Sequence, residues 1–302
     1  MKIVVTHTSP DMDAITSVWL IKKFLPDWAD SVVKFVQAGT RIDGGKWENK
    51  DQVSPIEKIE EDEVIHVDTG LGPLDHHQTS SDKVCGASLT WDYVRGKNSE
   101  FKSPETEKIK DRIEALSRMV LVVVDVDHFK EVFRKDPTAD YHEFDLIGIL
   151  EGLKFEYPNQ DDRYVDFVSQ CLDAILHEFE NRIWAEREIA DNGQKFDTRF
   201  GKGIGFEILN DTVIKLAQKM GYVIVVRKDP RKGYVRIKGI PSDGKTNIDL
   251  TAAYEELRKL DPEATWYLHV GKKMLLNGSA KNPKMRPSKL SVSEIIKVLE
   301  KI

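Results

Sequence analysis

The chain of 302 residues has little cysteine and no long apolar run, and each absence excludes a class of protein. Its only cysteines, Cys85 and Cys171, lie far apart and form no C-x-x-C spacing, which excludes a disulfide framework and a thiolate zinc site. No apolar stretch approaches the about 20 residues of a membrane-spanning helix, and no basic segment followed by an apolar run opens the chain. We therefore expect a soluble protein of the reducing cytoplasm with no membrane partner.

An excess of charge of one sign is also missing. The chain has 45 lysine and arginine residues against 51 aspartate and glutamate residues, for a net charge of -6. This balance neither favours nor excludes a polyanionic partner, so the local distribution of charge must decide. The hydrophobic content of 40% is enough to build the cores of one large or two ordinary domains.

Three β-like runs occupy the first seventy residues. "KIVVTH" (2–7) is rich in β-branched residues, and the apolar residues between 14 and 25 recur at helical spacing. "SVVKFVQAG" (31–39) and "DEVIHVDTG" (62–70) follow at the intervals of an α/β sheet. We predict a mostly parallel sheet flanked by helices. Ligands of such sheets collect at the carboxyl ends of the strands, where His7 and Asp68 both fall.

The remainder of the chain predicts a helical segment and a second domain. Residues 104–190 read mostly as helices, and the polar, glycine-rich stretch "DNGQKFDTRFGKG" (191–203) predicts a boundary. Beyond it lie further strands, helices, and a predicted hairpin of "YVIVVRK" and "YVRIKGI". We expect one domain over residues 1–190, which includes the helical segment 104–190, and a smaller α+β domain over residues 200–302.

Aspartate and histidine gather where the first strands are expected to end. "VVTHTSPDMDA" (4–14), "VIHVD" (64–68) and "LDHHQ" (74–78) supply His7, Asp11, Asp13, Asp68, Asp75, His76 and His77. Carboxylates and imidazoles together suit hard or borderline divalent cations, and manganese tolerates the mixture well. An aspartate between a strand and a helix is, taken alone, most often a helix N-cap. Three such groups at strand ends favour metal binding instead.

The order of these motifs carries a family resemblance. H-x-x-x-D-x-D-A, then V-D-x-G, then D-H-H resembles the DHH phosphoesterase superfamily. That superfamily includes RecJ-type exonucleases, nanoRNA and cyclic-dinucleotide phosphodiesterases, and manganese inorganic pyrophosphatases. "DHHQ" soon after "VDTG", with Gly86, Ala87 and Ser88 next, is most similar to the melanocyte proliferating gene-type 3′-5′ RNA exonucleases, whereas "THTSPDMDA" is nearer to the general superfamily form. The resemblance implies a metal-binding phosphoesterase domain followed by a substrate-binding domain.

The resemblance also implies two divalent cations, with Mn²⁺ preferred and Mg²⁺ as the alternative. It places His7 and Asp11 on one ion. It places Asp13 and His76 on the other, and Asp68 on both.

Further roles follow from the same resemblance. His77 would face the substrate phosphate, and Asp75 would orient an imidazole, which metal-bound histidines usually require. A fourth motif contributes one more aspartate, for which "VVVDVDHF" (122–129) offers Asp125 or Asp127. We favour Asp125. His128 beside them is expected to be an ordinary surface or packing residue.

A basic stretch near the C-terminus, "HVGKKMLLNGSAKNPKMRPSKLS" (269–291), predicts a substrate clamp. It has no acidic residue, and its glycines and small polar residues suit contact with phosphate oxygens. The candidate substrate-binding residues are Gly271, Lys272, Lys273, Asn277, Gly278, Lys281, Lys284 and Arg286. The turn of the predicted hairpin is also basic, with Arg227, Lys228, Arg231 and Lys232 either following a polynucleotide backbone or serving solubility alone.

The sequence is compatible with three functions. The first is a metal-dependent phosphodiesterase, a hydrolase that acts on short RNA, DNA or a nucleotide diester by attack of metal-bound hydroxide. For the melanocyte-type branch the activity would be that of a 3′-5′ RNA exonuclease. The second is an inorganic pyrophosphatase or another small phosphoester hydrolase. The third is a non-catalytic module that binds RNA or a nucleotide, against which the complete set of candidate ligands argues.

Overall fold

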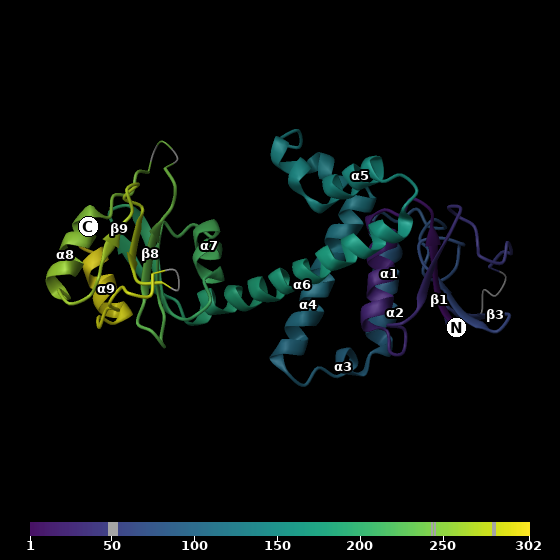
Figure 1. The fold of residues 1–302 in the computed structure, drawn as a ribbon, viewed down its shortest axis with the longest axis horizontal. Helices are drawn as coiled ribbons and strands as arrows, with labels where there is room; N and C mark the ends of the chain where they lie inside the picture. Colours follow the sequence, from purple (N-terminus) through teal and green to yellow (C-terminus); the bar gives the residue numbers. More distant parts are fainter. Residues whose placement is uncertain (48–53, 243, 245, 280–281) are drawn as a thin grey trace. The chain divides into compact units, whose positions relative to one another are not determined.

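The computed structural model describes residues 1–47, 54–242, 244, 246–279 and 282–302, and it divides the chain into two compact units. The first unit is Met1–Glu180 and the second is Asn181–Ile302. The division falls within helix α6 (Asp161–Asp191) and so comes earlier than the boundary predicted near residues 190–200, where this helix ends (Figure 1). Its last turns place Ala185 and Ile189 in a core of the second unit, so they belong with that unit.

A four-stranded sheet forms the base of the first unit, with strand order β2-β1-β4-β3. Strands β1 (Lys2–His7), β2 (Val32–Val36) and β4 (Asp62–His66) are parallel. Strand β3 (Ile56–Ile59), which is short and largely unburied, pairs antiparallel to β4. The predicted α/β fold with a mostly parallel sheet is confirmed, and the carboxyl ends of β1 and β4 lie side by side.

The rest of the first unit is mostly helical, and α1 (Met12–Phe24) packs against β1 of the sheet. Helix α1 is almost entirely buried, including the polar side chains of Asp13, Thr16 and Ser17. The other elements are α2 (Gly86–Lys97), α3 (Ser99–Lys102), α4 (Glu107–Asp127), the 3₁₀ helices η1 (Lys130–Phe133) and η2 (Asp140–Phe144), α5 (Leu146–Glu156) and α6. Across the described residues, none of the helices combines the length and the apolar character that crossing a bilayer would require.

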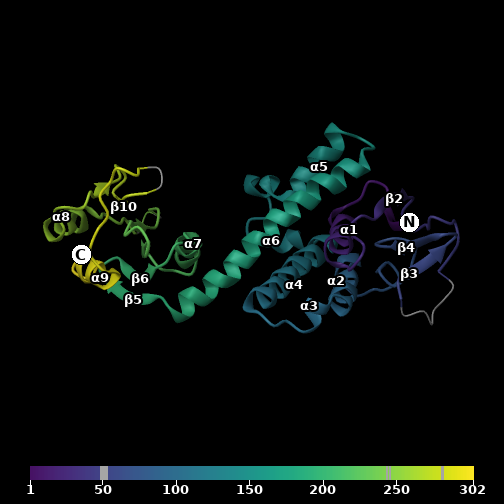
Figure 2. The same cartoon turned by 60° about the horizontal axis from the view of Figure 1, so that its bottom comes forward.

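The second unit has the predicted α+β composition (Figure 2). Its six-stranded sheet has the order β5-β6-β7-β8-β10-β9, in which only the pair β6 and β7 is parallel. The strands are β5 (Gln194–Thr198), β6 (Gly201–Glu207), β7 (Ile224–Lys228), β8 (Val235–Gly239), β9 (Tyr267–Leu268) and β10 (Met274–Asn277). The helices are α7 (Thr212–Lys219), α8 (Thr251–Leu260) and α9 (Val292–Leu299). The predicted basic hairpin is confirmed as β7 and β8.

The stretch "DNGQKFDTRFGKG" is not the linker that its composition indicates. It forms β5 and the start of β6, which pair antiparallel. Phe196 is buried in the core, and a Cβ atom at Gly203 would lie only 2.3 Å from its ring. The glycine therefore lets an aromatic ring pack against the neighbouring strand.

Candidate metal centre

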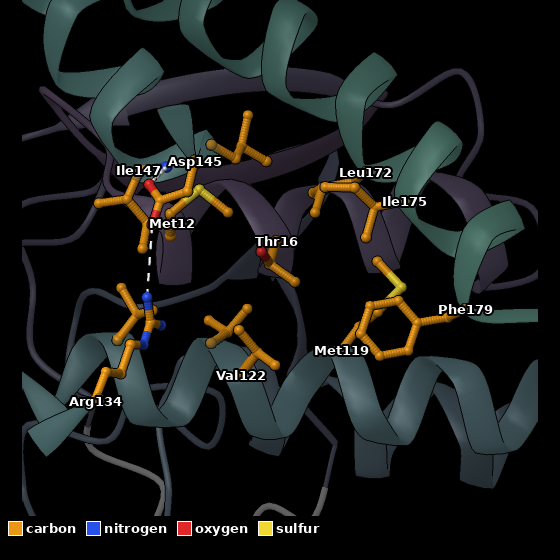
Figure 3. A pocket seen from close by; sticks show the side chains of 13 residues that line it. Met12, Thr16, Met119, Val122, Arg134, Asp145, Ile147, Leu172, Ile175 and Phe179 are labelled. Atoms are coloured by element: carbon orange, nitrogen blue, oxygen red, sulfur yellow. Dashed lines mark hydrogen bonds and ion pairs between the residues drawn. The ribbon is translucent and has the colours of Figure 1, made fainter. Parts of the chain in front are cut away.

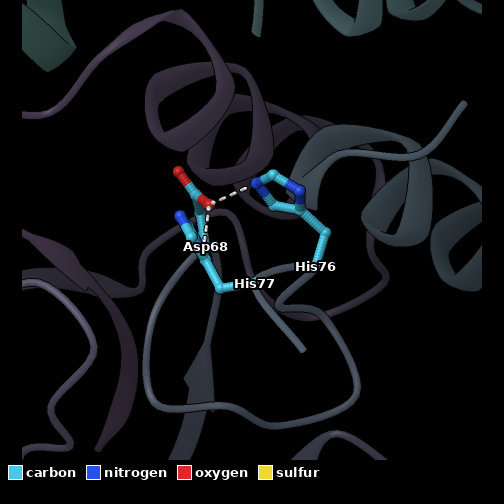
Figure 4. A group of neighbouring side chains, drawn as sticks. All are labelled: Asp68, His76 and His77. Atoms are coloured by element: carbon cyan, nitrogen blue, oxygen red, sulfur yellow. Dashed lines mark ion pairs between the residues drawn. The ribbon is translucent and has the colours of Figure 1, made fainter. Parts of the chain in front are cut away.

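Asp68 occupies the centre of the site at the carboxyl end of β4. Its side chain is 2% exposed, and its backbone is left-handed with φ 50, a conformation that aspartate tolerates better than most residues. One carboxylate oxygen, Oδ2, lies 3.3 Å from His7 Nε2. The other, Oδ1, lies 3.5 Å from His76 Nε2 (Figure 4). The two imidazoles therefore face opposite oxygens of one buried carboxylate.

The His76 side of the centre gathers three carboxylates around one ring nitrogen. His76 Nε2 lies 3.6 Å from Asp13 Oδ2 and 3.6 Å from Asp127 Oδ2, in addition to Asp68 Oδ1. These separations are too long for hydrogen bonds. Among the described residues, His76 Nε2, Asp68 Oδ1 and Asp127 Oδ2 are buried atoms with no hydrogen-bond partner. Buried polar atoms rarely lack a hydrogen-bond partner, so the presence of three such atoms close together requires an explanation.

A shared divalent cation explains this spacing. Ligand atoms about 2.1 Å from one ion lie roughly 3.0 to 3.5 Å from one another in octahedral or tetrahedral geometry. The separations around His76 are close to that range, and the donors are the oxygens and nitrogens that divalent cations bind. The residues present therefore fit a metal ion.

The His7 side of the centre is more open. His7 Nε2 lies 4.0 Å from Asp11 Oδ1, and the Asp11 side chain is half exposed. Asp11 is also the N-cap of α1, since the same oxygen accepts a hydrogen bond from the backbone N–H of Ala14 at 3.0 Å. The helix-cap interpretation and the ligand interpretation of Asp11 therefore describe the same side chain. His7, Asp11 and Asp68 form one group of possible ligands, and Asp68 belongs to both sides.

Asp13 joins the metal centre to the start of α2. Its Oδ2 accepts a hydrogen bond from Gly86 N and its Oδ1 from Ala87 N, both at 2.6 Å. Burial and the nearby charge of Asp68 hold the pKa of Asp13 well above its usual value, against the opposing effect of hydrogen bonds from Cys85 and Ala87. A Cβ atom at Gly86 would lie 2.9 Å from Asp13 Oδ2, so only glycine fits there.

Asp75 orients His77 and not His76. Asp75 is buried, and its Oδ1 lies 2.8 Å from His77 Nδ1 and accepts the backbone N–H of His77 at 3.0 Å. Its Oδ2 accepts the backbone N–H of Leu71 at 2.7 Å. The carboxylate is thus fixed by the loop, and it leaves Nε2 of the exposed His77 ring for another partner.

The preference for Asp125 does not fit the structure. Asp125 is exposed and lies 3.6 Å from Lys130 Nζ, whereas Asp127 is nearly buried and faces His76. Both residues lie in the last turn of α4, where two positions differ by about 200° around the helix axis, so only one can point into the site. Burial raises the pKa of Asp127 above its usual value.

His128 is a residue of the site that the sequence interpretation missed. Its Nε2 lies 2.9 Å from the carbonyl oxygen of Val84 and 3.6 Å from Asp127 Oδ2. Its ring centroid is 6.0 Å from that of His76. It could be grouped with His76 and Asp127 as a ligand, or hold the loop before α2 in place. Its position immediately after Asp127 was the available signal.

The acidic surroundings change the titration of two histidines. Burial lowers the pKa of His7, but hydrogen bonds to Asp68 and Thr8 and the charge of Asp11 outweigh it and raise the pKa to about 9. The facing carboxylate of Asp68 raises the pKa of His76 to about 9, with burial opposing it and the charges of Asp127 and Asp13 adding to it. Both imidazoles are therefore cationic at neutral pH when no metal is bound, and they partly neutralise the carboxylates.

We expect the metal-free protein to lose stability as pH rises from about 6.5 to about 9. Because the folded pKa values of His7 and His76 exceed the unfolded value, their protonation stabilises the fold fully below about 6.5, and this contribution disappears as pH passes the folded values. Urea unfolding in chelator at several pH values measures the decline, and Mn²⁺ should oppose it because deprotonated imidazoles bind cations. His7→Gln should flatten the profile. A free energy of unfolding that is constant or rises over this range would contradict the expectation.

Three of the predicted clamp residues of the second unit already have partners within that unit. Lys272 Nζ pairs with Asp249 at 3.1 Å, and Lys273 Nζ donates to Asn247 Oδ1 at 2.7 Å. Asn277 is buried and donates both amide hydrogens to the carbonyl oxygens of Thr265 and Arg286, at 3.0 and 2.9 Å. Its predicted donation to a phosphate was therefore wrong.

The other clamp residues do not gather at one place. Gly278 has φ +83, and a Cβ atom there would lie 2.3 Å from the Tyr234 ring, so the close approach is made by Tyr234 and not by a ligand. Gly278 lines one cavity and Lys284 lines another. Gly271 and Arg286 are exposed, and Lys281 lies outside the described residues.

The cavity beside Gly278 brings several basic side chains together. It has a volume of about 200 Å³ between the β7–β8 hairpin, Asp211 and the end of β10. The side chains around it include Asp211, Arg227, Asp229, Lys232, Tyr234, Arg236 and Ser279. Asp211 pairs with both Arg227, at 2.7 Å, and Arg236. Arg227 and Lys232 were among the candidate basic residues of the hairpin, whereas Arg236 and Asp211 meet only through the fold.

Comparisons with known proteins give weak likenesses. No family model and no curated protein matches the chain. Among solved structures it is similar to a DHH domain described as a member of a family of ribosomal proteins, with 14% identity, 99% of this chain and 86% of that chain covered, and a TM-score of 0.32.

Two other solved structures are similar over most of their length. A pGpG-specific phosphodiesterase from Vibrio cholerae shares 12% identity over 91% of this chain and 92% of that chain, with a TM-score of 0.27. A protein with the provisional name of family II inorganic pyrophosphatase from Methanococcus jannaschii shares 13% identity over 99% of both chains, with a TM-score of 0.20. At such values the likenesses carry no argument about this chain's activity, and its membership in the DHH phosphoesterase superfamily stays a prediction from the sequence motifs.

Proposed function

We propose that the protein is a divalent-metal-dependent phosphodiesterase that hydrolyses a short nucleic acid or a nucleotide diester, with 3′-5′ cleavage of RNA as the preferred substrate and direction. One observation carries the proposal. The Asp68 carboxylate lies between two groups of ligand-type side chains, and buried atoms on its His76 side have no hydrogen-bond partner among the described residues. This is the arrangement that a two-metal phosphoesterase requires.

The donor set assigns the ligands of the two ions. His7, Asp11 and Asp68 would hold one ion. The other would be held by Asp13, Asp68, His76 and Asp127. When bound, Mn²⁺, or Mg²⁺ as the alternative, neutralises charge on a phosphoryl group and lowers the pKa of a water molecule.

The chain's own groups position the substrate and the ligands. Asp75 holds His77 Nδ1, so Nε2 of the exposed ring is the atom left to contact a substrate phosphate. Asp13 and Asp68 are buried, which keeps their carboxylates in place without the substrate. In the second unit, the cavity with Lys232, Tyr234 and Arg236 offers cationic groups and an aromatic ring, the chemistry that suits a nucleotide phosphate and its base.

The experiment that tests the proposal is a substrate screen with purified protein. Short RNA, short DNA, a cyclic dinucleotide and pyrophosphate are each incubated with Mn²⁺, with Mg²⁺ and with chelator. We expect release of nucleotides from short RNA with Mn²⁺ and none in chelator. The reason is that bound cations neutralise charge on the phosphoryl group and lower the pKa of the attacking water. Turnover of pyrophosphate alone would favour the pyrophosphatase function. Tight RNA binding in chelator with no cleavage after metal addition would favour the binding module.

A further inference from the structure

The segment from Phe129 to Phe155 exposes an unusual number of aromatic side chains. Exposed fractions are 75% for Phe129, 85% for Phe133, 59% for Tyr141, 87% for Phe144 and 87% for Phe155. These residues come from η1, η2, α5 and their junctions, which form a group of short helices at the end of α4 (Figure 1). We call this group the aromatic patch. Single exposed apolar residues are normal, but five large rings in 27 residues are not.

The backbone beneath the aromatic patch is held by specific contacts. Asp145 caps α5 by accepting the backbone N–H groups of Ile147 and Gly148, both at 3.0 Å. The same carboxylate lies 3.5 Å from the Arg134 guanidinium (Figure 3). Tyr141 donates its hydroxyl to the carbonyl oxygen of Lys135 at 3.1 Å. The exposed rings are therefore presented by an ordered frame.

The inner side of the segment is already packed against the rest of the first unit. Ile147 lines an apolar cavity of about 220 Å³ together with Met12 of α1, Met119 of α4 and Leu172 of α6 (Figure 3). Because the segment buries this inner face and still exposes five rings, the exposed rings are not its means of attachment to the fold. They remain available to another surface.

The apolar area matches that of a stable interface. At about 200 Å² for each fully exposed aromatic residue, the exposed fractions correspond to roughly 800 Å². A standard protein interface buries about 800 Å² on each partner, so the summed exposed area of the five rings is of that size.

The charges around the rings select the kind of partner. Residues 129–155 contain four lysine or arginine residues and six aspartate or glutamate residues. The acidic excess disfavours a nucleic acid or an anionic membrane. Interspersed charges of both signs suit a two-fold interface, in which the acidic groups of one copy face the basic groups of the other.

Shape adds a further argument for a second copy. A cleft of about 790 Å³ lies between η1 and α5, with Val132, Pro137 and Phe155 among its lining residues, and the exposed Phe144 follows directly after another lining residue, Glu143. A surface that carries both a protruding ring and an apolar cleft can complement itself about a two-fold axis. We propose that the aromatic patch is the interface of a homodimer of this chain, and this does not depend on the proposed activity.

Sedimentation equilibrium of the full chain tests the proposal. We expect a mass of twice 34.5 kDa at micromolar concentration. The double variant Phe133→Ser, Phe144→Ser should weaken dimerisation at least about 100-fold, because a few buried aromatic residues carry most of the binding free energy of such interfaces. The variant and the wild type are compared at concentrations at which both are equally monomeric. Their thermal unfolding and circular dichroism should then match, because the side chains of Phe133 and Phe144 are almost fully exposed.

A matched control is available in the second unit. Val270 is 87% exposed, like Phe144, so Val270→Ser removes a similarly exposed apolar side chain from elsewhere and should leave the dimer intact. A wild-type protein that remains monomeric at concentrations well above the micromolar range would overturn the proposal. So would a double variant that dimerises as tightly as the wild type, or a Val270→Ser variant that alone dissociates the dimer.

Discussion

Asp68→Asn is expected to lower the phosphodiesterase rate at least about 100-fold while leaving the fold intact. Asp68 is the one carboxylate, among the described residues, whose two oxygens face both His7 and His76, so its charge serves both sides of the centre. Asparagine has nearly the same shape but replaces one oxygen with a donor and removes the charge. The rate of nucleotide release with saturating Mn²⁺ measures the loss. Calorimetric titration with Mn²⁺ provides a second readout that does not depend on turnover.

The matched control for Asp68→Asn lies on the strand that precedes it. Glu63→Gln also removes one carboxylate, but at the opposite end of β4 and on an exposed side chain that only approaches Lys2 at 3.7 Å. It should keep both the rate and the metal affinity. A rate of Asp68→Asn equal to the wild type would disprove the two-metal mechanism. If the wild type binds RNA in chelator and neither it nor Asp68→Asn cleaves RNA after Mn²⁺ is added, the protein would instead fit the binding module.

The second prediction with a large expected effect distinguishes Asp127 from Asp125 on α4. Asp127→Asn is expected to weaken Mn²⁺ binding by at least about tenfold, whereas Asp125→Asn should change it little. The reason is position, because Asp127 Oδ2 is a buried atom 3.6 Å from His76 Nε2 and Asp125 is exposed beside Lys130. Competition with a fluorescent metal indicator measures both affinities. The reverse result would restore Asp125 as the ligand and would require a different rotation of the end of α4.

In the first unit, the candidate site residues that follow a strand could be predicted from the sequence. A dense β-branched run predicts its strand without reference to the rest of the fold, so the positions of His7 and Asp68 followed from local sequence. The neighbouring carboxyl ends of β1 and β4 then bring them together. The choice between Asp125 and Asp127 could not be made from local sequence. Both lie on one turn of α4, and only the packing of the helix decides which one enters the site.

In the second unit, residue composition does not predict what the fold does with the asparagine and glycine of the basic segment. Asn277 and Gly278 have the residue types of a phosphate-binding loop, but the fold uses the asparagine amide to join two carbonyl groups and the glycine to admit Tyr234. Arg236 and Asp211, which meet beside Tyr234, are 25 residues apart. Contacts between distant segments of this kind depend on strand order and register, which a single sequence does not reveal.

Asp13 differs from the other carboxylates of the centre because α2 depends on it. Removing its side chain would leave the N–H groups of Gly86 and Ala87 buried without acceptors, at a cost of about 1 to 3 kcal/mol for each. Asp127 faces the imidazoles of His76 and His128, and Asp11 accepts one N–H at an exposed helix end. Under the proposed function, a descendant of this chain that lost catalysis could discard Asp127 without removing an acceptor from α2, but it would retain Asp13 to keep the protein folded. Among descendants of this chain, Asp127 is the better marker of a working enzyme.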